Sequence, residues 1–366
     1  MNASRSSLIL AWLFALTAAG PIAASAQSAL SETERSAVDS AVRAEMSRLR
    51  APGLSLAVVR DGAIAWAGGF GQSRIDRDIP ATEHTLYRTA SLAKPITATA
   101  VMQLVESGKI DPDAPVQRYC PAFPEKPWPV TVRHLLGHTS GIRHPTDDED
   151  EQTKHYDTIA DALPVFAGDR LLHAPGARTS YSTFGYMVLG CAIEGAGGTS
   201  YLNWLREHVF NSAGMTATTR DTVSYDDPRR AAGYRARGRT VGPSLRVDTS
   251  FKLAGGGLVS NVVDLAHFAI GTLGDDLVSA ATRERMWTPV RLNDGTVTPF
   301  GLGWQVSTSK RGRPVIMANG QQEEVSTLLV IFPEQKSAIV LMSNLERSVQ
   351  QLVPLIERLR AAAGLD

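Results

Sequence analysis

Two serine–lysine pairs have the Ser-x-x-Lys spacing that can activate a hydroxyl group as a nucleophile. They are Ser91 with Lys94 and Ser307 with Lys310. A serine hydroxyl attacks a carbonyl only when a neighbour takes its proton, and a lysine can do so when burial or positive neighbours lower its pKa. Ser307 leads into a polar hairpin turn, so we discount that pair. Ser91 opens a predicted helix, which puts Lys94 one turn along the same face and the positive end of the helix dipole beside the serine.

Tyr181 is a second candidate for proton transfer. It stands immediately before Ser182 and Thr183, at the start of a helical segment. A tyrosine there can relay a proton if cationic neighbours lower its pKa. The alternative is a core tyrosine whose hydroxyl is simply hydrogen-bonded.

Three histidines lie close together in the segment HLLGHTSGIRH: His134, His138 and His144. The first two have the spacing of a metal pair on a helix, but no third ligand with proper spacing is evident. We therefore predict structural or supporting roles for them and no metal site. The sequence also lacks G-x-S-x-G, H-E-x-x-H, G-x-G-x-x-G and P-loop signatures, so it predicts no cofactor.

Elements from both ends of the chain must position these residues. A capping box at Ser31 opens a helix, Asp61-Gly62 turns a hairpin within 53–71, and a helix covers 91–108. Near the other end, a last amphipathic helix covers 349–362. Strands are predicted between these parts at 301–308, 313–318, 325–332 and 337–342.

The middle of the chain differs in composition, being richer in Pro, Gly and charge. Helical patches are predicted at 131–136, 158–166, 183–195 and 200–210, and the acidic run 147–151 is predicted to be a solvated loop. We therefore predict an α/β (α+β) fold in which an antiparallel sheet with flanking helices carries an inserted, mostly helical domain. The predicted boundaries are 27–110 with 251–366 for the sheet domain and 111–250 for the insert.

The first 26 residues have the layout of a secretion signal. Arg5 precedes an apolar run over 8–19, and a small-x-small pattern predicts cleavage after Ala26. The run is too short to span a bilayer comfortably, although an uncleaved anchor is the alternative. We expect a periplasmic or secreted protein with no stable membrane anchor once the signal is removed.

The charge balance limits the classes of partner, and the two cysteines allow one disulfide. Lys and Arg number 37 and so do Asp and Glu, which gives no electrostatic reason to expect nucleic acid. A small molecule or a peptide is the expected partner. The two cysteines, Cys120 and Cys191, can pair in an oxidising compartment or stay as two buried thiols; the sequence leaves both open.

Several long segments resemble the serine β-lactamase-like superfamily, which includes class C β-lactamases, D-alanyl-D-alanine carboxypeptidases and related esterases and peptidases. The resemblance runs from about residue 34 to residue 345. The shorter segments YCPAFPEKPW, SGIRH and YSTFGY are similar to its LACTB-like branch. The segments that resemble the superfamily are RTASLAKPITATAVMQLVESGKIDPDAPV (88–116), TVRHLLGHTSGI (131–142) and AGGGLVSNVVDLAHF (254–268).

The resemblance implies a β-lactamase/transpeptidase-like fold and an acyl-enzyme mechanism. Ser91 would attack a carbonyl, and Lys94 with Tyr181 would share the role of general base. The backbone N–H groups of Ser91 and Gln321 would form the oxyanion hole. Water would then hydrolyse the acyl-enzyme with help from the same pair.

The chain departs from the superfamily at the third motif, which is Lys or His, then Thr or Ser, then Gly. That motif should fall at Ala318-Asn319-Gly320, so Asn319 and Gly320, together with Thr183, would contact substrate. Ala318 supplies no cation, and the Gly-rich stretch that usually follows is replaced by 321–324, which carries two glutamates.

A missing cation and added acids disfavour an anionic substrate. We therefore expect penicillins and D-Ala-terminated peptides to be poor substrates, and neutral esters or internal amides to be better ones. Arg143 or Lys252 could supply a replacement cation. The leading interpretation is an exported serine hydrolase with esterase-like or peptidase-like activity and weak or no β-lactamase activity.

Two alternatives remain at this point. One is a non-catalytic binding or assembly protein on the same fold, which Ala318 favours and the intact Ser91, Lys94 and Tyr181 oppose. The other is a metal-dependent hydrolase that uses the histidine cluster. The LACTB-like relatives also suggest that the chain can form an oligomer or a filament.

Overall fold

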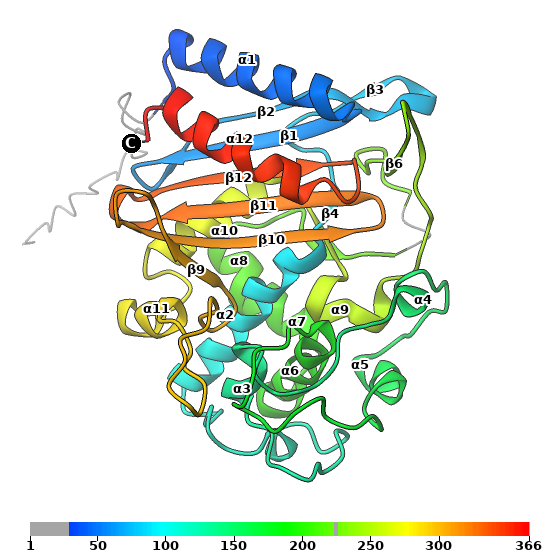
Figure 1. The fold of residues 1–366 in the computed structure, drawn as a ribbon, viewed down its shortest axis with the longest axis vertical. Coiled ribbons are helices and arrows are strands. Elements are labelled where there is room, and N and C mark those ends of the chain that lie inside the picture. The colour runs from blue at the N-terminus through cyan, green and yellow to red at the C-terminus, as the bar shows by residue number, and fades with distance from the viewer. Residues whose placement is uncertain (1–28, 223–225, 366) are drawn as a thin grey trace, which may run out of the picture.

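One large antiparallel sheet organises the protein. The computed structural model describes residues 29–222 and 226–365, so the predicted signal over 1–26 lies outside the described residues. The sheet has the strand order β3-β2-β1-β12-β11-β10-β9 (Figure 1). Its strands are β1 (Gly53–Arg60), β2 (Ala63–Arg74), β3 (Ile79–Pro80), β9 (Gln305–Thr308), β10 (Pro314–Gln322), β11 (Val325–Phe332) and β12 (Ser337–Ser343).

The sheet joins the two ends of the chain, which confirms the predicted antiparallel fold. β1 pairs with β2 on one side and with β12 on the other. The β1–β2 hairpin turns at Asp61 and Gly62, whose φ angles of 53° and 73° are those of the tight turn that suits twisted strands. β10 and β11 form the next hairpin, and β9 pairs only with the first part of β10.

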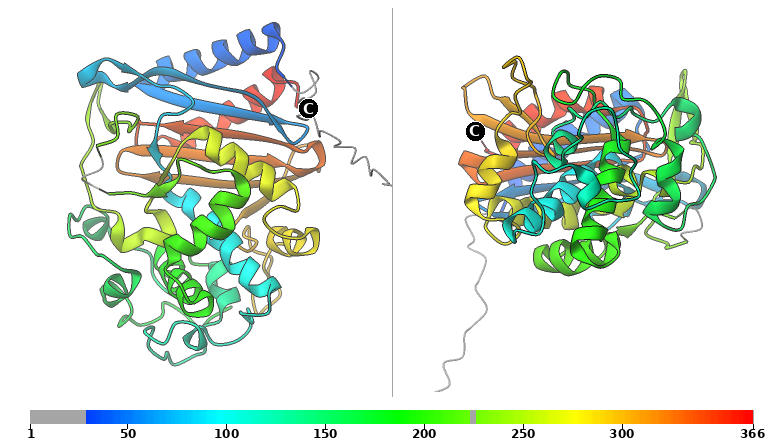
Figure 2. Two further views of the ribbon diagram at one scale, coloured as in Figure 1. Left: turned by 180° about the vertical axis from the view of Figure 1, so that it is seen from behind. Right: turned by 90° about the horizontal axis from the view of Figure 1, so that it is seen from below.

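Helices cover both faces of the sheet. Leu56 and Val58 of β1 belong to the apolar cluster beneath α1 and α12, whereas Ala57 and Val59 belong to the cluster on the opposite face. This alternation is expected of a strand buried on both sides. Figure 2 shows α10 lying across that second face. The helices on the two faces are α1 (Glu32–Leu49), which begins at the predicted Ser31 capping box, α10 (Val262–Leu273) and α12 (Val349–Ala362). α2 (Ala93–Glu106) contributes apolar side chains to the same cluster as Ala57 and Val59.

The remaining helices lie between β4 and β9 in the chain, and α3, α5, α7 and α9 pack against α6. They are α3 (Val132–Leu136), α4 (Asp147–Asp150), α5 (Ile159–Ala162), α6 (Thr183–Gly197), α7 (Tyr201–Leu205), α8 (Asn211–Ala213), α9 (Leu253–Gly256) and α11 (Ala280–Trp287). Five short strands form two small sheets outside the main one: β4 (Tyr87–Arg88), β8 (Leu258–Ser260) and β5 (Thr219–Arg220) in one, and β6 (Tyr234–Arg237) with β7 (Thr240–Pro243) in the other. The division into two domains with the stated boundaries stays a prediction.

Three local predictions need correction. The acidic run begins a helix, α4, because Thr146 caps it and Glu149 completes the capping box, so it is not a loop. The strand predicted over 301–308 begins only at Gln305. The strand pairs β6–β7 and β5–β8 were not predicted, since their short strands lack a clear alternating pattern.

Cys120 and Cys191 form a disulfide, with their Cα atoms 5.3 Å apart. The bond ties the loop that follows the turn Val116–Arg118 to the middle of α6. It settles the pairing that the sequence left open. No helix in 29–222 or 226–365 is both long and apolar enough to cross a membrane.

Candidate active site

Ser91 lies in a single 3₁₀ turn, Ala90–Leu92, that leads directly into α2. Ala90 has a φ of 47°, a left-handed conformation that non-glycine residues rarely adopt. Such strain persists only where the surroundings impose it, and it is frequent at functional sites. Here Thr89 anchors the turn, because its carbonyl oxygen accepts a hydrogen bond from Thr327 Oγ1 of β11.

The structure brings Lys94 to Ser91 as the spacing predicted, with Lys94 Nζ 3.0 Å from Ser91 Oγ. Lys94 is only 3% exposed, and its amine also donates to Thr183 Oγ1 at 2.9 Å and to the carbonyl oxygen of Gly255 at 2.7 Å. Burial, reinforced by the charge of Lys252, holds the pKa of Lys94 well below its ordinary value. A neutral amine can keep both donor contacts and direct its lone pair at Ser91.

Tyr181 approaches the same serine, with its hydroxyl 2.7 Å from Ser91 Oγ. The amine of Lys94 lies 4.8 Å from the centre of its ring. The sequence argument required cationic neighbours to lower the pKa of Tyr181, but burial raises that pKa instead. Tyr181 is therefore a protonated hydroxyl at neutral pH, able to donate a proton, and Lys94 is the better acceptor.

Two of the three histidines hold the segment that carries Tyr181. His138 Nδ1 accepts from the backbone N–H of Ser182, and His144 Nδ1 accepts from that of Thr183, both at 3.2 Å. The rings of His138 and Tyr181 lie 4.4 Å apart, centre to centre. Burial lowers the pKa of His144 to about 4 and that of His138 well below its ordinary value, so both are neutral acceptors. They are positioning residues.

The third histidine, His134, caps the N-terminus of α3. Its Nδ1 accepts from the backbone N–H of Thr131, which completes the capping box of that helix. Within residues 29–222 and 226–365, no group of three or more His, Cys, Asp or Glu side chains is arranged to hold a metal ion. The other Ser-x-x-Lys pair lies apart from this site: Ser307 is exposed on β9, and its hydroxyl donates to Val315.

Gly255 is a part of the site that sequence reasoning missed. It lies in the segment 254–268 that resembles the superfamily, but neither its residue type nor its spacing from Ser91 indicated a role. A Cβ atom at this position would lie 2.7 Å from Thr183 Cγ2 and 2.9 Å from the carbonyl oxygen of Thr183. Glycine is required because α9 passes very close to the start of α6. This close approach lets the Gly255 carbonyl of α9 and the Thr183 hydroxyl of α6 contact the same Lys94 amine.

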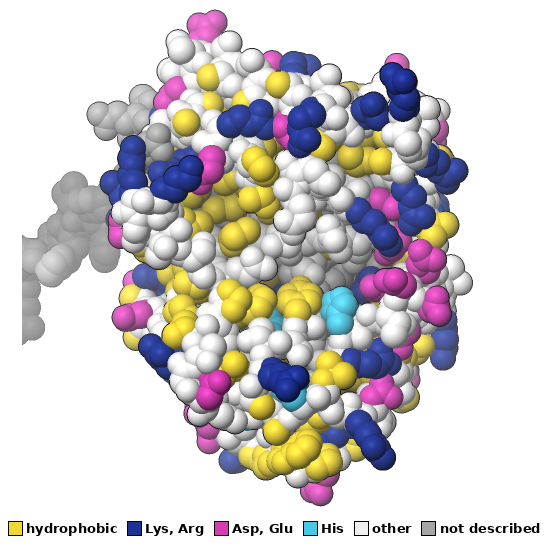
Figure 3. All heavy atoms as spheres, viewed as in Figure 1, with side chains coloured by type: hydrophobic (Ala, Val, Ile, Leu, Met, Phe, Trp, Pro, Cys, Tyr) yellow, Lys and Arg dark blue, Asp and Glu magenta, His cyan; other side chains and the backbone are white. Residues whose placement is uncertain are grey.

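Ser91 opens into a cleft of about 520 Å³ between the sheet and the helices. Figure 3 shows this face of the molecule hollowed across its middle. The volume is in the range of small-molecule sites. The cleft is lined by Ser91, His144, Asp147, Asp150, Tyr181, Thr183, Lys252, Gly255, Gly256, Phe300, Gln305, Asn319, Gln321, Gln322, Glu323, Arg347, Val349 and Gln350.

The end of β10 passes beside Ser91, where the third motif was expected. A Cβ atom on Gly320 would lie 2.7 Å from the backbone nitrogen of Ser91, so only glycine permits this approach. Gln321 and Asn319, its neighbours in β10, both line the cleft. Asn319 Nδ2 donates to Gln305 Oε1 at 3.4 Å across to the next strand.

Ala318 stands where the superfamily's third motif has a Lys or His, so no cation is present at that position. Ala318 is 7% exposed and lines a narrow recess together with Ser91, Lys94 and Tyr181. Of the two replacement cations considered, Lys252 lines the cleft but is paired with Asp150 at 2.5 Å.

Arg143 is not among the residues that line the cleft. Instead it pairs with Glu149 and Asp169, each at 2.6 Å. The replacement cation proposed at Arg143 is therefore ruled out by its position.

The two glutamates after β10 have different surroundings. Glu323 lines the cleft, 3.7 Å from Arg347. Glu324 instead pairs with Arg88 and Arg230, at 3.2 and 3.4 Å. Of the two acids, Glu323 lines the cleft and Glu324 does not.

Carboxylates from the acidic run also face the cleft. Asp147 and Asp150 of α4 both line it, although the sequence had predicted a solvated loop there. This part of the cleft wall could not be foreseen, because α4 is distant from the serine along the chain.

A comparison with protein families accounts for this arrangement. The family model described as Beta-lactamase matches residues 38–363, nearly all of the described chain. The chain belongs to the beta-lactamase family. It is a serine hydrolase of the β-lactamase-related class, and its predicted fold and relatives are confirmed.

Similar proteins come from bacteria, mitochondria and archaea. Protein flp of Staphylococcus aureus is 24% identical over 90% of this chain and 66% of its own length. The mitochondrial serine beta-lactamase-like protein LACTB of Mus musculus is 26% identical over 78% of this chain and 70% of its own. The chain thus spans about two thirds of these relatives. The octameric penicillin-binding protein homologue of Pyrococcus abyssi has a TM-score of 0.78 and 26% identity, and covers 90% of this chain and 77% of its own.

Proposed function

We propose that this chain is an exported serine hydrolase that acts through an acyl-serine intermediate on an ester or an amide. One observation carries the proposal: two proton-handling groups converge on Ser91 Oγ, Lys94 Nζ at 3.0 Å and the Tyr181 hydroxyl at 2.7 Å. A proton acceptor beside a hydroxyl is the requirement for serine nucleophilic catalysis. The adjoining cleft has room for a small substrate.

In acylation, Ser91 Oγ bonds to the carbonyl carbon while its proton passes to the neutral amine of Lys94. The carbonyl electron pair moves onto oxygen, where the backbone N–H groups of Ser91 and Gln321 stabilise it. Removal of one such donor generally costs about a hundredfold or more in rate. The bond to the leaving group then breaks, and the leaving group takes a proton back from the Lys94–Tyr181 pair.

In deacylation, water attacks the acyl carbon and gives its proton to the same pair. The ester bond to Ser91 breaks, which releases the acid and restores the serine hydroxyl. Thr183 and the carbonyl of Gly255 hold the Lys94 nitrogen in place through both half-reactions, because each can accept from the amine in either protonation state.

The charges of the cleft support a neutral acyl donor. Asp147, Asp150 and Glu323 line it, against the cations of Lys252 and Arg347. Both cations are already paired, with Asp150 and Glu323 respectively. A substrate carboxylate would have to displace one of these pairs, whereas a neutral ester or an internal amide would not. We therefore propose weak or no β-lactamase activity.

Two observations support export. The disulfide between Cys120 and Cys191 is typical of proteins that leave the reducing cytosol. The sequence before Gln27 has the layout of a secretion signal. Expression with the natural N-terminus, followed by cell fractionation and N-terminal sequencing, tests this part; an intact N-terminus in the cytosolic fraction contradicts it.

Assembly into an oligomer is also part of the proposal, and the octameric homologue of Pyrococcus abyssi supports it. Light scattering on the purified protein measures the mass directly. A mass equal to one chain at every concentration contradicts this part.

Labelling with a fluorophosphonate, read by intact mass, tests the catalytic part of the proposal. We expect one adduct on the wild type and none on Ser91→Ala. Ser307→Ala is the matched control, since it removes the serine of the other Ser-x-x-Lys pair and should label normally. Absence of an adduct on wild type, under conditions that label a related hydrolase, would favour a non-catalytic protein on this fold.

A further inference from the structure

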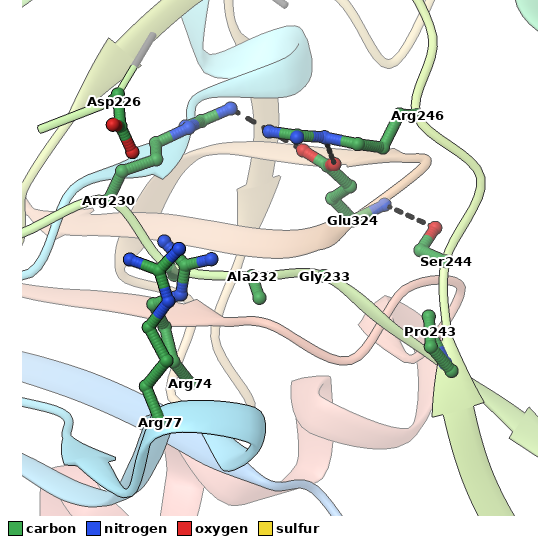
Figure 4. A pocket seen from close by; sticks show the side chains of 11 residues that line it. Arg74, Arg77, Asp226, Arg230, Ala232, Gly233, Pro243, Ser244, Arg246 and Glu324 are labelled. Atoms are coloured by element: carbon green, nitrogen blue, oxygen red, sulfur yellow. Dashed lines mark hydrogen bonds and ion pairs between the residues drawn. The ribbon is translucent and has the colours of Figure 1, made fainter. Parts of the chain in front are cut away.

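A second pocket lies away from the catalytic cleft and shares none of its lining residues. It has a volume of about 410 Å³ and is bounded by the end of β2, the loops on both sides of the β6–β7 hairpin, and the β10–β11 turn (Figure 4). It is lined by Arg74, Arg77, Asp226, Arg230, Ala231, Ala232, Gly233, Pro243, Ser244, Arg246 and Glu324. The lining thus contains four arginines and two carboxylates, those of Asp226 and Glu324.

Arg230 forms the inner wall and is the strongest sign of a ligand. It is 6% exposed, and its Nη2 pairs with Asp221 at 2.8 Å and with Glu324 at 3.4 Å. Its Nη1 is buried, and no hydrogen-bond partner for it exists in the described part of the chain. A buried N–H that stays unpaired is costly and uncommon. Burial also lowers the pKa of Arg230, and a further anion would offset this effect.

Arg74 and Arg77 form the wall nearest to the end of β2. Figure 4 shows both guanidinium groups pointing into the pocket, toward the side where Arg230 lies. Their nearest carboxylate is that of Asp76, 3.7 Å from Arg74 and 3.8 Å from Arg77, beyond hydrogen-bond distance. Asp76 is thus an ion-pair partner shared by both arginines, and two guanidinium groups that share one carboxylate keep a net positive charge that a further anion would offset.

Arg246 lies at the rim, with its side chain 69% exposed and 3.9 Å from Glu324. Glu324 is held there by the backbone: it has a φ of 76°, and a Cβ atom on Gly233 would lie 2.1 Å from the Glu324 Cβ. The pocket is therefore formed by defined backbone positions and not by mobile side chains alone.

We propose that this pocket, hereafter the arginine pocket, binds the phosphate group of a small molecule. Guanidinium groups form paired hydrogen bonds to phosphate oxygens, and several arginines that converge from different elements suit a multivalent oxyanion better than a single carboxylate. The volume exceeds the needs of one phosphate and leaves room for an organic part. The proposal concerns a site separate from the catalytic serine and does not depend on the proposed hydrolase activity.

Calorimetric titration of the purified, full chain with inorganic phosphate tests the proposal, with ionic strength kept constant by sodium chloride. We expect saturable binding and a melting temperature that rises with phosphate concentration, because the ligand binds only the folded state. The double variant Arg77→Gln with Arg246→Gln should bind at least about tenfold more weakly, since hydrogen bonds to charged groups are lost. Both side chains are more than half exposed, so the fold should be kept.

The matched control is Arg43→Gln with Arg311→Gln, which removes the same charge from exposed positions outside the pocket. This variant should bind phosphate as the wild type does. The proposal is overturned if the wild type shows no saturable binding, or if the pocket variant binds as tightly as the wild type. Equal weakening in the control variant would also overturn it, because general charge attraction would then explain the binding.

Discussion

The Lys94 amine lies 2.7 Å from the carbonyl oxygen of Gly255, a contact between residues 161 positions apart in the chain. A carbonyl accepts from the amine whether it is neutral or charged, so the nitrogen stays in place when the proton moves. Thr183 Oγ1 gives a second fixed contact at 2.9 Å. The geometry therefore suits a lysine that takes a proton from Ser91 and returns it.

The pH profile of catalysis should reflect the lowered pKa of Lys94. Because only the neutral amine can accept a proton, kcat/KM for a neutral ester should rise with pH through that lowered pKa and then reach a plateau. The plateau should be reached well below about 10.4, where a free lysine titrates. A rate that keeps rising to that pH would contradict a buried, neutral Lys94.

The same burial makes protein stability depend on pH. Between the lowered pKa in the folded state and about 10.4, the unfolded chain binds more protons at this lysine, so the wild type gains stability as the pH rises. Lys94→Met lacks this gain. The free energy of unfolding of the wild type, relative to the variant, should therefore increase with pH by at most about 1.4 kcal/mol per unit. Urea unfolding at several pH values measures it, and a constant difference would refute it.

Tyr181→Phe should lower kcat by about a hundredfold or more, since the hydroxyl 2.7 Å from Ser91 Oγ is lost as a proton donor. KM should change little. Tyr186→Phe is the matched control, because that buried tyrosine donates to the carbonyl of Leu136 and not to Ser91. Equal losses in the two variants would mean that the effect comes from packing.

Ala318→Lys should restore hydrolysis of substrates that carry a carboxylate. The recess at Ala318 adjoins Ser91 and Tyr181, so a new ammonium there can pair with a carboxylate and lower the pKa of the tyrosine. We expect kcat/KM for a chromogenic cephalosporin to rise about tenfold, the effect of one charge-assisted hydrogen bond. Ser307→Lys on β9 adds the same charge outside the recess and should leave this rate unchanged.

Gly255→Ala should reduce turnover because its Cβ would meet Thr183 at 2.7 Å and displace the two groups that hold Lys94. We expect a fall in kcat of about tenfold or more, since small displacements of catalytic groups are costly. Gly256→Ala is the matched control, because a Cβ atom there would lie 3.3 Å from its nearest neighbour, the end of the Gln322 side chain. Comparable loss in both would indicate a general disturbance of α9.

Local signals in the sequence sufficed for much of the framework. The Ser31 capping box, the Asp61-Gly62 turn and the proximity of Lys94 to Ser91 each depend on residues a few positions apart. Such features follow from backbone geometry alone. The strand patterns at the two ends of the chain predicted the antiparallel sheet, the resemblance to the superfamily implied the same fold, and the structure and the family comparison confirmed it.

The electrostatics of the site could not be foreseen, because they depend on burial and on distant neighbours. Sequence reasoning required a lowered pKa for Tyr181, whereas its burial raises that pKa. Acids near the cleft were expected only from Glu323 and Glu324, yet Glu324 pairs with Arg230 outside it and the acidic run supplies Asp150 within it.

The sequence by itself indicated the candidate nucleophile and its lysine, because the Ser-x-x-Lys spacing of Ser91 and Lys94 falls in the segment 88–116 that resembles the superfamily. Only the tertiary structure decided what surrounds them. Tyr181, Thr183 and Gly255 are 89 to 161 positions away from Ser91 or Lys94, and packing of α2 against α6 and α9 brings them within hydrogen-bond distance. The physical reason is that the pKa of a buried amine is set by the solvent it loses and the charges it meets, and both follow from packing.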